Sequence, residues 1–153
     1  PSGWSGYRRI LSIRTDASGN IMRILQWGDR VYWKDPPIDC YTTNPGTSAV
    51  LQTLTVPSGV RVMSNFNWFA YWPNAAKNIY FTCPDQDDEV GSYNTAPVAD
   101  FYSMGGVAMQ TAGRREILTD TSSRIRYRQT DTNSSTAIGI GTNGWIDPRG
   151  RNW

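Results

Sequence analysis

Histidine is absent from the 153 residues of this chain. Serine and cysteine nucleophiles are usually activated by histidine, and zinc sites usually include it, so the common forms of both are excluded. The nucleophile pattern Gly-x-Ser-x-Gly is missing as well. A glycosidase needs only two carboxylates, but the spacing of the 13 acidic residues singles out no pair. We therefore expect a protein that is not an enzyme and that uses no cofactor.

Long apolar runs and lysine are also scarce. No stretch approaches the roughly 18 apolar residues of a membrane span, so we expect no membrane insertion. Lys34 and Lys77 are the only lysines among 15 basic residues, and the formal net charge of +2 is too balanced to imply nucleic acid as the main partner. Arginine is enriched and lysine depleted at protein interfaces, and the chain also holds seven Trp and eight Tyr. The composition therefore favours an oligomer.

Cysteine is limited to Cys40 and Cys83, whose spacing does not require a disulfide. We expect both to be free thiols, as is usual in proteins assembled inside cells. The first residue is Pro rather than Met. We therefore expect the chain to be a processed or trimmed part of a longer protein.

Helical periodicity is nearly absent, whereas 14 Gly and nine Pro interrupt short β-rich runs at intervals typical of an all-β fold. Residues 5–34 predict a small meander of three strands, the first over residues 7–14, with tight turns between them. Pro36 and Pro37 end the meander, because two consecutive prolines supply no donors to a strand ladder.

Two units are expected from this pattern. Residues 1–40 form the β-meander and connect to a missing N-terminal part, and residues 41–153 form a β-sandwich head of jelly-roll or immunoglobulin-like type. About seven strands are expected in the second unit, at residues 50–56, 60–72, 77–83, 99–110, 116–119, 123–129 and 137–142.

The predicted strand at residues 60–72 alternates regularly between its two faces. One face carries large apolar residues from Phe66 to Trp72 at every second position, which predicts that this face lies in the core. Phe69 and Tyr71 point the other way. Large aromatic residues opposite the core are candidates for an interface or a ligand surface.

The segment Arg124-Ile-Arg-Tyr-Arg128 places Arg124, Arg126 and Arg128 on one face of a strand, with Ile125 and Tyr127 directed to the core. We call these three residues the arginine stripe. Three like charges are costly when buried unpaired, so they require solvent, acidic partners or an anionic ligand. A charge-protected edge strand, a subunit interface and a surface for acidic polysaccharide all remain open, and we favour the interface.

The last 17 residues predict a strand at 137–142 followed by a tight turn at Asn143-Gly144. Trp145 and Ile146 then form an apolar clamp that pins the polar C-terminal tail. The run from Gly139 to Gly144 matches a dinucleotide-binding pattern, but too few residues follow it to supply the helix that this pattern requires.

The acidic residues from Asp85 to Glu89 are hard oxygen donors of the kind that calcium prefers. Their spacing does not fit an EF-hand loop. We therefore expect a solvated loop and no metal site.

Six short segments follow one another in a fixed order and span most of the chain: Arg9–Ile13, Gly28–Lys34, Thr43–Thr47, Leu54–Val60, Asp120–Arg126 and Gly144–Arg151. In this order the chain resembles the C-terminal regions of tail-fibre or tail-module structural proteins of tailed bacteriophages. The resemblance implies a virion protein that is assembled in the bacterial cytoplasm as a β-sandwich head at the end of a fibre, typically a homotrimer.

Partners and roles follow from the same resemblance. They are further copies of the chain, other virion proteins contacted through the missing N-terminal part, and a host surface polysaccharide as receptor. We expect receptor binding and host attachment. A capsid decoration or head-fibre protein is the alternative, and a polysaccharide-degrading tail enzyme is a less favoured one.

Overall fold

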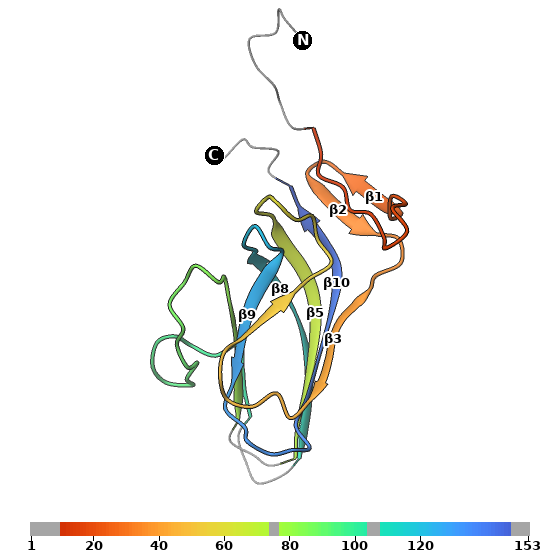
Figure 1. The fold of residues 1–153 in the computed structure, drawn as a ribbon. Coiled ribbons are helices and arrows are strands. Elements are labelled where there is room, and N and C mark those ends of the chain that lie inside the picture. The colour runs from red at the N-terminus through yellow and green to blue at the C-terminus, as the bar shows by residue number, and fades with distance from the viewer. Residues whose placement is uncertain (1–9, 74–76, 104–107, 148–153) are drawn as a thin grey trace, which may run out of the picture.

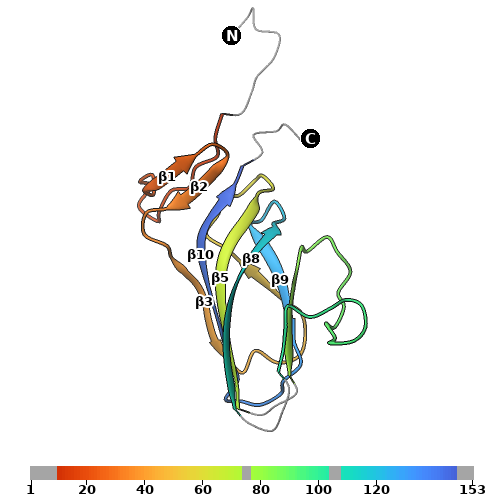
Figure 2. The ribbon, with the colours of Figure 1, turned by 180° about the vertical axis from the view of Figure 1, so that it is seen from behind.

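Two antiparallel β-sheets pack face to face in the computed structural model (Figures 1 and 2). It describes residues 10–73, 77–103 and 108–147. These residues form ten strands and no helix. The prediction of an all-β sandwich is confirmed.

The strands of the six-stranded sheet are β1 (Ile24–Trp27), β2 (Arg30–Trp33), β3 (Ile38–Thr43), β5 (Met63–Trp72), β8 (Met109–Leu118) and β10 (Ala137–Ile146). β10 is central: it pairs along its whole length with β5, which pairs with β8. On its other side β10 pairs first with β3 and then with β2 of the β1–β2 hairpin. Figure 1 shows this hairpin at the end of the sandwich where β10 ends.

The four-stranded sheet contains β4 (Val50–Thr53), β9 (Arg124–Gln129), β6 (Asn78–Thr82) and β7 (Phe101–Tyr102), in that spatial order. Its inner face is mainly apolar, because most of the inward residues of β9 and β6 are large and hydrophobic; buried Gln129 at the end of β9 is the polar exception among them. Ile125 and Tyr127 are buried, as predicted.

The core between the sheets is rich in aromatic side chains. The predicted alternation of β5 is confirmed, since Phe66, Trp68, Ala70 and Trp72 are all buried. Phe66 packs edge-on against Phe81 of β6 with 5.5 Å between ring centroids. Such pairs stabilise a fold through buried area together with favourable ring geometry.

The predicted turn at Asn143-Gly144 is wrong, because β10 continues through it to Ile146 with a register shift between Thr142 and Gly144. Strands on both sides of β10 pair with the residues that follow the shift, which keeps the chain extended. Glycine is required at 144, since a Cβ there would lie 2.0 Å from the carbonyl oxygen of Val31. The Asn-Gly pair therefore forms a bulge rather than a turn.

Other strand boundaries also differ from the prediction. β3 was not predicted, and the single strand expected at residues 99–110 is replaced by the two-residue β7 and the start of β8. β8 runs unbroken across residues 111–115, which the sequence left between two strands, because β5 pairs with it over its full length. Residues 10–14 form no strand, and just after them a single β-bridge joins Thr15 to Ile21. The amide of Ser12 instead donates to the carboxylate of Asp147, 2.8 Å away.

The β1–β2 hairpin is joined to the sandwich by hydrogen bonds and by packing. β2 pairs with β10, and Val31 and Trp33 lie in the common core. The division into a connector of residues 1–40 and a head of residues 41–153 stays a prediction.

Candidate interaction surface on the outer face of the six-stranded sheet

The arginine stripe lies on the outer side of β9, and each of its side chains binds an acceptor within the chain. Arg124 pairs with Asp120 at 2.8 Å. Burial alone would raise the pKa of Asp120, but the amide and the guanidinium of Arg124 outweigh it and hold that pKa below its ordinary value. This pair ties the start of β9 to the preceding turn.

Arg126 and Arg128 bind the acidic loop of residues 85–89. Arg126 donates to the hydroxyl of Thr82 at 3.1 Å and to the carbonyl oxygen of Gln86, and Arg128 pairs with Asp88 at 3.0 Å. Arg61 pairs with Asp85 of the same loop. Within the described residues, no three His, Cys, Asp or Glu side chains gather to hold a metal ion.

Trp145 is buried in β10 and packs against Trp33, with 4.9 Å between ring centroids. Its indole N–H has no hydrogen-bond acceptor among the described residues, whereas the indole N–H of Trp33 donates to the carbonyl oxygen of Thr55 at 2.8 Å. Ile146 is half-buried on the opposite face. The proposed clamping of the tail falls on residues 148–153, which lie outside the described residues.

Cys40 and Cys83 are both free thiols, as expected. Burial raises the pKa of the Cys40 thiol, which shares a hydrogen bond with the hydroxyl of Tyr127. Burial and this contact raise the pKa of Tyr127 to about 12. Both groups are therefore neutral core residues at physiological pH.

Phe69 and Tyr71 lie on the outer side of the six-stranded sheet, away from the core. The strand register shows which other residues share this side, in rows that run from strand to strand. We call the following set the outer face: Leu25, Trp27, Arg30, Tyr32, Ile38, Tyr41, Met63, Asn65, Asn67, Phe69, Tyr71, Gln110, Ala112, Arg114, Glu116, Leu118, Gly139, Gly141, Gly144 and Ile146.

Large apolar side chains on the outer face are strongly exposed. Ile38 and Trp27 are each 81% exposed, and Tyr41 is 68% exposed. Scattered exposed apolar residues are normal, but a contiguous set on one sheet face marks an interaction site. Of the residues predicted for an interface or ligand surface, Phe69 and Tyr71 belong to this face, and the arginine stripe lies on the other sheet.

A shallow apolar groove of about 290 Å³ crosses the middle of the outer face. Gly139 and Gly141 of β10 form its floor, and Ile38, Tyr41 and Phe69 form its walls. The rings of Tyr41 and Phe69 have centroids 6.0 Å apart. A Cβ at Gly139 would lie 2.1 Å from the ring of Phe69, so glycine allows this ring to lie across β10.

A polar network borders the groove and neutralises most of the charge on the outer face. Arg30 pairs with Glu116 at 2.9 Å, and Asn65 also donates to Glu116 at 2.9 Å. Arg114 donates to the amide oxygen of Asn65 at 2.8 Å. The hydrogen bond from Arg30 is the main cause that holds the pKa of Glu116 below its ordinary value.

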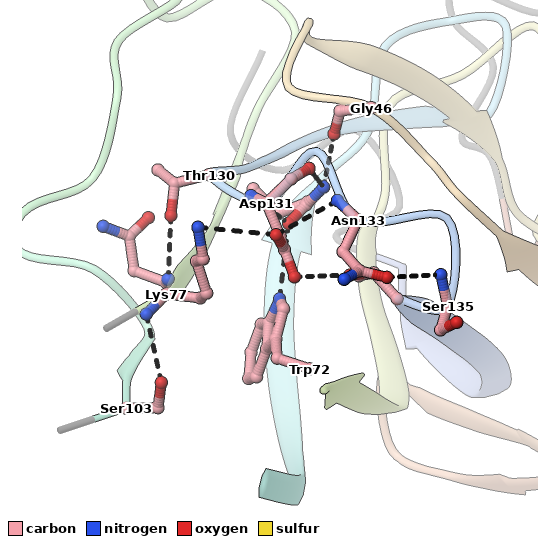
Figure 3. A network of polar contacts seen from close by, with 11 residues as sticks. Gly46, Trp72, Lys77, Ser103, Thr130, Asp131, Asn133 and Ser135 are labelled. Carbon is pink, nitrogen blue, oxygen red and sulfur yellow. Dashed lines mark hydrogen bonds and ion pairs between the residues drawn. The ribbon is translucent and has the colours of Figure 1, made fainter. Parts of the chain in front are cut away.

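A second polar network joins the loops at the end of the sandwich where β5 ends and β6 begins (Figure 3). Asp131 is buried, 3.4 Å from the ammonium of Lys77, and accepts a hydrogen bond from the hydroxyl of Thr136 at 2.6 Å. Burial alone would raise the pKa of Asp131, but these donors outweigh it and lower that pKa. With its polar atoms bound to one another, this network holds the loops together.

No protein-family model matches the sequence, and no curated protein is significantly similar to it. Among the described residues, no helix reaches the length and hydropathy needed to cross a membrane.

Proposed function

We propose that the protein is a structural β-sandwich module of a tailed-bacteriophage virion, placed at the end of a fibre and used in host attachment. The observation that carries the binding role is the exposed aromatic outer face. Aromatic residues, Met and Arg are the residue types enriched at interfaces. Tyr41 and Phe69 lie side by side on this face, and Trp27 and Met63 lie on the same side of the sheet, nearer the hairpin end.

The assignment to a virion fibre is supported by the six ordered segments that resemble tail-module proteins. The sandwich agrees with the fold that this resemblance implies. A homotrimer, with other virion proteins contacted through a preceding part of the chain, belongs to the same proposal.

Adsorption of the purified, fluorescently labelled protein tests this function. We expect it to bind intact cells of the bacterial strain that propagates the phage and to compete with the phage for adsorption. Binding to empty capsids instead of cells would favour a capsid decoration or head-fibre protein. Release of reducing sugar from cell-surface polysaccharide would favour a tail enzyme.

A further inference from the structure

The outer face is large enough for a stable protein interface. Ten-residue strands are about 33 Å long and four strands about 19 Å wide, which gives roughly 600 Å² of projected area per copy. A specific interface needs about 1,000 Å² in total from both partners. The projected area of two copies of this face together exceeds that value, and side chains that protrude from the sheet add further area.

The charge of the outer face suits contact with an identical face. A twofold axis brings the same surface patch of two copies together, so a patch of one sign repels itself. Here Arg30 and Glu116 neutralise each other, and only Arg114 remains as a net charge among the outer-face residues. The side chains of the arginine stripe already bind acceptors of their own chain, which leaves them less available to a second copy.

The groove also favours a protein partner over a sugar. Saccharide sites need several convergent polar groups to hydrogen-bond hydroxyls. The groove lining is mostly apolar, and its hydrogen-bonding side-chain groups are few, namely the amide of Asn67, the hydroxyl of Tyr41, the indole N–H of Trp68 and the thiol of Cys40. An apolar side chain from a neighbouring protein fits this lining better.

We infer that copies of this chain pack against one another through the outer face, with Ile38, Tyr41 and Phe69 near the centre of the contact and Trp27 at its end. Face-to-face contact joins two copies about a twofold axis, so it is a contact between pairs of chains and differs from the threefold contact of the proposed homotrimer. It also takes the place of the arginine stripe as the expected subunit interface. Residues that are 68% to 81% exposed in one chain are then covered by the next.

Substitution of Ile38 tests the inference with little risk to the fold, because this side chain is 81% exposed. We expect Ile38→Glu to weaken assembly and to raise the dissociation constant of the oligomer about tenfold or more, as measured by sedimentation equilibrium. Val98→Glu is the matched control, since Val98 is an exposed apolar residue (68%) outside the outer face. Its dissociation should equal that of the unaltered protein.

Hydroxyl-radical footprinting gives an independent measurement on the unaltered protein. Tyr93 is the internal reference, because it lies outside the outer face and is 59% exposed. In the assembled protein, the oxidation rates of Tyr41 and Trp27 should be several-fold lower than the rates expected from their exposed fractions in the single chain. The oxidation rate of Tyr93 should match the rate expected from its exposed fraction.

A monomeric unaltered protein, an Ile38→Glu variant that assembles normally, or full oxidation of Tyr41 would overturn the inference. Loss of assembly in Arg126→Glu alone would place the interface on β9 and would also overturn it. Cell adsorption is measured separately, so a wrong interface can be distinguished from a wrong function.

Discussion

Two tryptophans in contact, Trp145 and Trp33, provide a sharp test of the core because only one of them has its indole N–H bonded. A buried tryptophan removes about 150–250 Å² from water, worth roughly 4–6 kcal/mol at 25 cal/mol per Å². Removing the unpaired N–H of Trp145 returns about 1–3 kcal/mol of that loss. The difference is about 1–5 kcal/mol, and the cavity left by the ring places Trp145→Ala in the upper part of this range, at a loss of about 3–5 kcal/mol in the free energy of unfolding.

Phenylalanine substitutions separate the hydrogen bond from the packing. Trp145→Phe loses part of the ring but also removes the unpaired N–H, whereas Trp33→Phe leaves the carbonyl oxygen of Thr55 without its donor. We expect Trp33→Phe to cost about 1 kcal/mol or more beyond Trp145→Phe.

Urea unfolding of the three variants measures these free energies, and thermal unfolding should follow at about 2–4 °C per kcal/mol for a chain of this size. Equal costs for the two phenylalanine variants would refute the reasoning about the unpaired N–H. A loss below about 1 kcal/mol in Trp145→Ala would show that the indole is not buried.

Three further predictions concern charge and backbone. Because the folded-state pKa of Asp131 is lowered, its stabilisation is present above its ordinary pKa of 3.8 and is lost as the pH falls through the folded-state value. Asp131→Asn should thus be less stable to urea than the unaltered protein at pH 7, and the difference should shrink as the pH falls below 3.8. Gly144→Ala should lower the free energy of unfolding, measured with urea, by about 3 kcal/mol, because the new Cβ would meet the backbone of Val31. Gly139→Ala should lower it by less, because the ring of Phe69 can turn away. A larger loss in Gly139→Ala than in Gly144→Ala would contradict this. Arg126→Glu should speed amide hydrogen exchange in residues 84–89, which Arg126 holds, and unchanged exchange would show that the loop does not depend on it.

The core faces of β5 and β9 could be predicted from the sequence, because strict alternation of side chains along a strand fixes which residues lie together. The outer face was only partly predictable. Ile38 and Tyr41 are three residues apart, so strict alternation would place them on opposite faces. The register shift between β3 and β10 brings both to the outer side, and no local pattern signals that shift.

The partners of the arginine stripe were unpredictable for a related reason. Arg128 meets Asp88 across 40 positions of sequence, and this contact depends on how the loop after β6 folds back. The bulge at Gly144 was missed because the Asn-Gly pair favours a turn locally, whereas pairing with β2 and β5 keeps it extended. Long-range pairing overrides local preference in both cases.

The position of β10 between β5 and the two strands β2 and β3 also has a consequence for folding during synthesis. β2 and β3 precede β10 by about a hundred residues, and neither pairs with β5. Until residues 137–146 leave the ribosome, the six-stranded sheet exists only as separate pieces with unpaired edges and uncovered aromatic residues. Such nascent chains are prone to aggregation and to proteolysis. Chains whose synthesis stops before Ala137 are therefore expected to be degraded before they can assemble. Only chains that contain β10 can complete the six-stranded sheet.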